Sequence, residues 1–246
     1  MPTFAKGPAF SGGGGVAPLP PGDLVFITAG QSNAANYAKP LDTSVPGVNV
    51  LASGLTGPTF SQAFDPQPVA DNTFSSPWPR LGDALYARTG RRIKFISVGQ
   101  GNTQISQWVP GQANYNKIKS AVQLFPVNGF TAFLWHQGEN DASFGTSQSA
   151  YSSALISIIN QLRADAGWNA PCGIAIATHP NEATGAGVIA AQTSVGTTYY
   201  ACFQGANTDT LGNTFRQVDN THFTTPTGTT AHANLWYNAI VGYFGL

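Results

Sequence analysis

The fold is indicated most clearly by the stretch Leu24-Val25-Phe26-Ile27-Thr28-Ala29-Gly30-Gln31-Ser32-Asn33. Its first six residues are almost continuously apolar, which is typical of a parallel strand that is covered on both faces. Ser32 follows shortly after this predicted strand, 24–29. Because α/β sheets bind ligands beyond the carboxyl ends of their strands, the sequence predicts that Ser32 lies at a ligand-binding edge.

Further apolar runs have the same character, and helical patterns alternate with them. The strongest helical pattern covers 149–166, where apolar side chains recur every three to four residues. The other predicted strands are 93–98, 131–136, 173–178 and 198–203. This alternation predicts an α/β fold, namely a three-layer α/β/α sandwich with a central, mostly parallel five-stranded sheet. We expect the irregular stretch 40–77 to pass over the ligand-binding edge.

Composition limits the partners. Charged residues make up only 9% of the 246 residues, and the formal net charge is zero. The sequence has no basic patch of the kind that binds nucleic acid, and no apolar run of about 18 residues that would predict a membrane span. A neutral polar surface favours an extracellular or particle-associated protein that handles sugars, for example one on a phage virion.

The first 22 residues differ from the rest. They are rich in Gly and Pro and lack the apolar core of a signal peptide. We expect 1–22 to be a flexible arm that attaches the chain to a larger particle, followed by one α/β domain, 23–246.

The cysteines and histidines leave alternatives open. Cys172 and Cys202 permit one disulfide or two buried free thiols, and we favour the free thiols. We interpret His179 and His232 as structural. Because no group of His, Cys, Asp and Glu has the spacing of metal ligands, we expect neither a metal nor another cofactor.

The candidate catalytic residues are Ser32, Asp219 and His222. A serine hydroxyl attacks a carbonyl only if a base takes its proton, and an imidazole is a suitable base. A carboxylate close to that imidazole holds its tautomer and stabilises the charged form. The chain order Ser…Asp…His selects no fold, since such triads are recognised by geometry.

Two polar segments follow other predicted strands and therefore converge on the same edge. Segment 99–103 contains two glycines, which let a backbone N–H approach a substrate closely. Segment 135–141 carries side-chain amides. Together with the N–H of Ser32, which is free if a helix begins there, these segments are suited to form an oxyanion hole.

Four segments, in order along the chain, resemble the SGNH hydrolase superfamily and, within it, the sialate O-acetylesterase-like carbohydrate esterases. The segments are Gly30-Gln31-Ser32-Asn33, Gly101-Asn102-Thr103-Gln104-Ile105 with Trp108, Trp135-His136-Gln137-Gly138-Glu139, and Asp219-x-x-His222. The resemblance covers the catalytic domain but not the arm. It implies a flavodoxin-like SGNH fold.

The resemblance also implies an activity. Ser32 is then the nucleophile, His222 the base and Asp219 its partner, in a serine esterase that removes O-acetyl groups from a carbohydrate through an acetyl-enzyme. Two other readings stay open. One is a non-catalytic carbohydrate-binding or adhesin module, which the arm and the scarce charges favour. The other is a short-chain lipolytic esterase, which the lack of a long apolar lid makes less attractive.

The oxyanion donors are less well defined. The resemblance implies the N–H groups of Ser32 and Gly101, although Gly99 competes with Gly101 because the chain lacks an adjacent glycine pair. The third donor is Gln137 or Asn140, and we slightly favour Gln137.

Substrate binding is assigned to Gln31, Trp108 and His136, of which the tryptophan is a candidate for stacking on a sugar ring. Glu139 and Asp141 invite a glycosidase reading, with one acid and one nucleophile or base. We favour structural roles for both, as carboxylates that bind loop amides.

Overall fold

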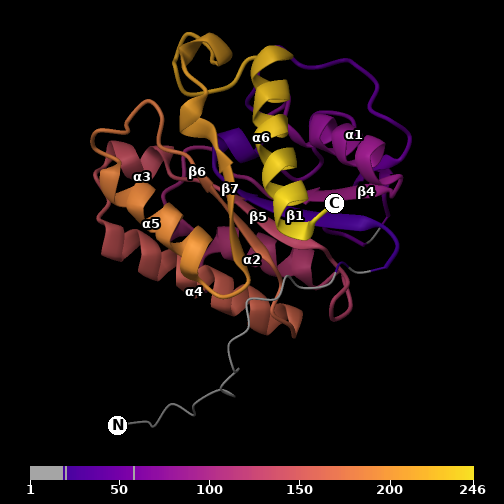
Figure 1. Ribbon diagram of the computed structural model, residues 1–246, viewed down its shortest axis with the longest axis horizontal. Coiled ribbons are helices and arrows are strands. Elements are labelled where there is room, and N and C mark those ends of the chain that lie inside the picture. The colour runs from indigo at the N-terminus through magenta and orange to yellow at the C-terminus, as the bar shows by residue number, and fades with distance from the viewer. Residues whose placement is uncertain (1–18, 20, 58) are drawn as a thin grey trace.

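The computed structural model describes residues 19, 21–57 and 59–246, so most of the predicted arm lies outside the described residues. A seven-stranded sheet is enclosed between two layers of helices (Figure 1). Its strand order is β3-β2-β4-β1-β5-β6-β7. All neighbouring strands are parallel except β2 and β3. The predicted α/β/α sandwich with a mostly parallel sheet is confirmed.

Five strands correspond to the predicted apolar runs. They are β1 (Leu24–Gly30), β4 (Ile93–Ser97), β5 (Ala132–His136), β6 (Cys172–Ile176) and β7 (Cys202–Asn207). The predicted bounds of the last strand are wrong, because Thr198 still belongs to a helix and the strand begins at Cys202.

The predicted number of strands is also wrong. β2 (Val50–Ala52) and β3 (Ser61–Gln62) extend one edge of the sheet. They lie in the stretch that was predicted to be irregular. Runs of three and two residues are too short to show an alternating pattern, so only their pairing reveals them, β2 with β4 and β3 with β2.

The helices form one layer on each face of the sheet (Figure 1). Successive side chains of β1 point to opposite layers: Leu24 and Phe26 to one, Val25 and Ile27 to the other. The first layer holds α1 (Trp78–Thr89) and α6 (Thr227–Phe244), and the second holds α2 (Ala113–Val122), α4 (Gln148–Ala166) and α5 (Ala186–Thr198). The connections contain α3 (Glu139–Ser143) and the 3₁₀ turns η1 (Ser32–Ala34), η2 (Ile105–Gln107), η3 (Thr208–Thr210) and η4 (Asn213–Phe215).

Helix α4 confirms the strongest helical prediction. The Ser147 hydroxyl caps its first turn by accepting a hydrogen bond from the N–H of Ala150 at 3.3 Å. Gly167 ends it with a left-handed φ of 72°. The buried stripe includes the predicted apolar residues Tyr151, Leu155, Ile158, Ile159 and Leu162.

Gly30 brings the end of β1 against the end of β5. A side chain at Gly30 would place its Cβ 1.9 Å from the carbonyl oxygen of His136, and φ is 137°. Only glycine fits this close approach. The N–H of Gln31 then donates to the same carbonyl at 3.1 Å, so Ser32 starts its turn beside the 136–141 segment.

Cys172 and Cys202 are free thiols, in line with the favoured alternative. They are register partners at the start of β6 and β7, at the sheet edge opposite to Ser32. In the described part of the chain, no helix is long and apolar enough to cross a membrane.

Candidate active site

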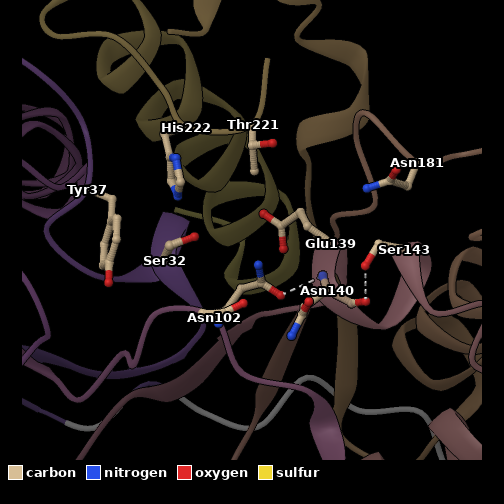
Figure 2. Close-up of a pocket in the computed structure, with 10 residues that line it drawn as sticks. Ser32, Tyr37, Asn102, Glu139, Asn140, Ser143, Asn181, Thr221 and His222 are labelled. Carbon is tan, nitrogen blue, oxygen red and sulfur yellow. Dashed lines mark hydrogen bonds between the residues drawn. The ribbon is translucent and has the colours of Figure 1, made fainter. Parts of the chain in front are cut away.

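Ser32, Asp219 and His222 come together at the carboxyl edge of the sheet. Ser32 opens η1 directly beyond β1 and is 3% exposed. It lines a pocket of about 370 Å³ together with His222 (Figure 2). Nδ1 of His222 lies 2.7 Å from Oδ2 of Asp219. The structure therefore joins the early serine to the late Asp-x-x-His pair, as the motif order implies.

A tight turn holds the aspartate and the histidine together. Oδ1 of Asp219 accepts the N–H groups of Thr221 and His222, both at 2.9 Å, a geometry that Asp favours in turns. Burial alone raises the pKa of Asp219, but hydrogen bonds from His222 and from backbone N–H groups outweigh it, so the net pKa is lowered. Asp219 is thus a carboxylate at neutral pH.

Arg216 and Asn33 attach this turn to the rest of the site. The Arg216 guanidinium is buried and donates to the carbonyl oxygens of Thr221 (2.5 Å), Thr208 (2.8 Å) and Leu211 (2.9 Å). The side-chain amide of Asn33 donates to the same Thr221 carbonyl at 3.0 Å. The residue next to Ser32 therefore binds the residue next to His222.

The glycine segment after β4 differs from the expectation. The N–H of Gly101 is donated to Oδ2 of Asp71 at 3.1 Å, and Gly99 packs against the Ala34 backbone. Neither glycine lines the pocket, so the prediction that Gly101 donates into an oxyanion hole is not supported by this geometry. Asn102 lines the pocket instead, with a left-handed φ of 54°. Asparagine tolerates that conformation better than most residues.

Gln137 is not available to a substrate, which corrects the favoured choice of third donor. Its side chain is fully buried, and Nε2 donates to Asp141 (2.6 Å) and to the Thr103 carbonyl (3.0 Å). Its Oε1 accepts the Tyr151 hydroxyl at 2.9 Å. Asn140, the alternative donor, lines the pocket.

Gln31, predicted to bind substrate, lines the pocket, but its side-chain oxygen is bonded within the protein. Its Oε1 accepts the backbone N–H groups of Asn140 (3.1 Å) and Gly138 (3.3 Å). Its Nε2 donates to no partner among the described residues and so remains available at the pocket.

His136 and Trp108 do not reach the pocket. Both are fully buried. Trp108 donates to the Thr103 hydroxyl at 2.9 Å and packs edge-on against Trp135. Burial lowers the pKa of His136 to about 3, so its ring is neutral, and it lies 3.1 Å from the Thr208 hydroxyl. The predicted substrate contacts of both residues are therefore wrong, because each completes the core beneath the site.

Glu139 and Asp141 have separate environments. Asp141 binds loop groups, including the N–H of Ile105 at 2.7 Å, as the structural interpretation predicted. Glu139 lines the pocket, and its Oε1 accepts the Asn33 amide at 2.8 Å. Its Oε2 is buried without a partner within 19, 21–57 and 59–246. Burial raises the pKa of Glu139 to about 7.

Replacing Glu139 with glutamine should change how stability depends on pH. The folded protein holds the Glu139 proton more tightly than the unfolded chain, so the contribution of Glu139 to stability falls as pH rises from about 4.5 to about 7. The contribution is on the order of 3 kcal/mol. Glu139→Gln keeps an acceptor for the Asn33 amide but has no carboxyl group to ionise, so it should not lose this stability as pH rises.

Urea unfolding of both proteins between pH 4.5 and 7.5 measures the difference. The buried His136 and His232 have lowered pKa values and contribute with the opposite sign in both proteins, so the difference between the profiles reports position 139, including its contact with His136 at 3.9 Å. Glu182→Gln is the matched control, because the pKa of Glu182 is lowered and its contribution has the opposite sign. Parallel pH profiles for wild type and Glu139→Gln would show that Glu139 ionises freely in the folded state.

Other pocket residues were missed by sequence reasoning: Tyr37, Ser143, Asn181 and Thr221. They lie outside the recognised motifs, apart from Thr221 within Asp-x-x-His. No group of three or more potential metal ligands occurs in the part of the chain that the structure describes.

The fold and the site define a hydrolase of the SGNH type. More narrowly, the chain belongs to the family described as "Carbohydrate esterase, sialic acid-specific acetylesterase", whose sequence model matches residues 22–238. It is thus a carboxylic ester hydrolase, a carbohydrate O-acetylesterase. No curated protein matches it by sequence.

Solved structures share the fold at low sequence identity. A protein from Arabidopsis thaliana is similar with a TM-score of 0.66 and 18% identity, over 91% of this chain and 100% of that one. NanS is similar with a TM-score of 0.66 and 15% identity, over 92% and 99%. A carbohydrate acetylesterase from Xanthomonas citri is similar with a TM-score of 0.63 and 16% identity, over 90% of this chain and 56% of that one.

Proposed function

We propose that this chain removes O-acetyl groups from a carbohydrate by nucleophilic catalysis, with Ser32 as nucleophile, His222 as base and Asp219 as its partner. The observation that carries the proposal is the pocket that Ser32 and His222 line together, with Asp219 bound to His222 at 2.7 Å. This bond occupies Nδ1 of the imidazole, so Nε2 is the nitrogen left for the serine proton.

The reaction then has two halves. The Ser32 oxygen attacks the acetyl carbonyl while its proton passes to His222. The tetrahedral intermediate collapses, His222 gives the proton to the departing sugar oxygen, and an acetyl-enzyme remains. Water gives a proton to His222 and attacks this ester. The bond between the acetyl carbon and the Ser32 oxygen breaks, acetate leaves, and His222 returns the proton to Ser32.

Four groups at the pocket are suited to stabilise the oxyanion. The backbone N–H groups of Ser32 and Asn102 make no hydrogen bond within the described residues, and both residues line the pocket. The side-chain amides of Gln31 and Asn140 are further donors there. We propose Asn102 in the role that the motif comparison gave to Gly101. Each such donor typically contributes about 2.7–4 kcal/mol to transition-state stabilisation.

The pocket lining favours a polar substrate with a small acyl group. Besides Asn140, the polar side chains of Ser143 and Asn181 line the pocket, whose volume is about 370 Å³. Hydroxyl and amide side chains bind sugar hydroxyls, whereas a long acyl chain would need an apolar wall. The proposed setting is extracellular or particle-associated, with 1–22 as an attaching arm, for the compositional reasons given above.

Acetate release tests this proposal. The purified chain is incubated with acetylated xylan, O-acetylated sialic acids and acetylated bacterial surface glycans, with Ser32→Ala as the matched control. We expect acetate from at least one glycan, and none from the variant. Faster turnover of long-chain than of acetyl esters would favour a lipolytic enzyme. Failure of a fluorophosphonate to label Ser32 would favour a non-catalytic binding module.

A further inference from the structure

Tyr37 lies against the catalytic histidine. Its ring stacks on the His222 imidazole, with centroids 5.1 Å apart and planes inclined by 19°. Figure 2 shows the two rings facing each other at one side of the pocket, next to Ser32. Tyr37 also lines the pocket, so it is at the site and not behind it.

The backbone of Tyr37 also contacts the segment 217–222, which carries Asp219 and His222. Its carbonyl oxygen accepts the side-chain amide of Gln217 at 2.8 Å. The backbone N–H of Gln217 in turn donates to the carbonyl oxygen of His222 at 2.7 Å. Both the ring and the main chain of Tyr37 therefore contact the segment that carries Asp219 and His222.

The hydroxyl of Tyr37 anchors the ring from the other end. It donates to Oδ2 of Asp71 at 2.7 Å, and the same oxygen accepts the N–H of Gly101 at 3.1 Å. Burial and the Asp71 carboxylate raise the pKa of Tyr37 to about 12, so the hydroxyl remains a donor at neutral pH. The ring is held between Asp71 on one side and His222 on the other.

This arrangement explains why residue 101 is a glycine. A Cβ at Gly101 would lie 2.0 Å from the Tyr37 hydroxyl oxygen and 2.4 Å from the ring carbon that carries it. The φ of Gly101 is outside the left-handed range, so conformational freedom does not require a glycine here. What the position requires is room for Tyr37.

We propose that Tyr37 is a positioning residue that holds the His222 imidazole in the orientation needed for proton transfer, and that Gly101 serves the reaction by leaving room for it. This inference rests on the proposed role of His222. The His222 imidazole needs such support because the turn that carries it is partly open to solvent. The side chains of His222 and Asp219 are 24% and 45% exposed. Misplacement of a catalytic group by about 1 Å can reduce a rate about 100-fold.

Steady-state kinetics of p-nitrophenyl acetate hydrolysis test the proposal. Tyr37→Ala should lower kcat by about 10- to 100-fold with little change in KM, because orientation fails while binding is kept. Tyr37→Phe retains the stacked ring and should keep most of the activity. Gly101→Ala should lower kcat by about 10-fold, since its Cβ displaces the ring. Matched controls are Gly212→Ala, where nothing lies within 4 Å, and Tyr200→Ala, at a 58% exposed tyrosine.

The double variant separates the two explanations of Gly101. If Gly101 acts only through Tyr37, Gly101→Ala should cost no further activity in a Tyr37→Ala background. An equal loss in both backgrounds would overturn the proposal, because Gly101 would then act on its own. A raised KM with unchanged kcat in Tyr37→Ala would also overturn it, because the tyrosine would then only contact substrate.

A measurement without turnover distinguishes failure of this inference from failure of the proposed function. The chain has four histidines, so the imidazole carbon–proton signals can be assigned by single substitutions. Stacking on Tyr37 should displace the His222 signal upfield, and both Tyr37→Ala and Gly101→Ala should abolish the displacement. A His222 signal that neither substitution moves would overturn the inference even if the enzyme is active. An inert wild type with the displaced signal would refute only the proposed chemistry.

Discussion

Replacing Ser32 with alanine is expected to lower kcat for p-nitrophenyl acetate by about 10⁴- to 10⁶-fold, because the attacking oxygen is removed. The fold should be unaffected. Ser32 begins a 3₁₀ turn through its backbone, and its hydroxyl makes no hydrogen bond within the described parts of the chain. The residual rate would come from the oxyanion donors and from binding.

The measurement is kcat for the wild type and the variant, with circular dichroism as a check of folding. Ser152→Ala is the matched control, since Ser152 lies on α4 and its hydroxyl donates to the Ser149 carbonyl oxygen at 3.3 Å, away from the pocket. Undiminished turnover by Ser32→Ala would refute the nucleophile assignment.

Replacing Asp219 with asparagine is expected to lower kcat by about 10²- to 10⁴-fold, a range typical for the loss of a triad carboxylate. An amide can hold the imidazole in the wrong tautomer, and it cannot stabilise the charged imidazole that forms when the serine loses its proton. The lowered pKa of Asp219 indicates that the native group is ionised across the neutral range, so the effect should persist from mildly acid to alkaline pH.

Measuring kcat from about pH 5 to about pH 9 checks this expectation, because this range spans neutral pH, where imidazole groups change charge. Asp83→Asn is the control, because Asp83 lies on α1, away from His222, and accepts an exposed N–H, that of Gly47, at 2.8 Å. Wild-type kcat in Asp219→Asn would leave His222 without an essential carboxylate partner and reduce the triad to a pair.

The sheet and the helices were largely predictable because burial repeats along the chain. The run that ends at Gly30 is apolar on both faces, and α4 has a stripe that is buried along its length. The short edge strands β2 and β3 were not predictable, since two or three residues carry no period.

The candidate site was predictable in its motifs but not in its contacts. Ser32 and His222 share a pocket as the motif order implies. Gly101, Gln137 and Trp108 belong to the same motifs, yet their polar groups are bonded to neighbours under the pocket. A motif records which residue types recur together, and it does not record which of their atoms are already bonded within the protein.

The sequence alone determined the sandwich architecture, the family and the residues of the candidate triad, because these depend on periodic burial and on short ordered motifs. Only the tertiary structure decided that Asn102 lines the pocket in place of Gly101, and that Tyr37 lies on His222. Both depend on where atoms from remote segments meet. The 2.0 Å between the Tyr37 hydroxyl and a Cβ at Gly101 is a distance between two loops that no local pattern encodes.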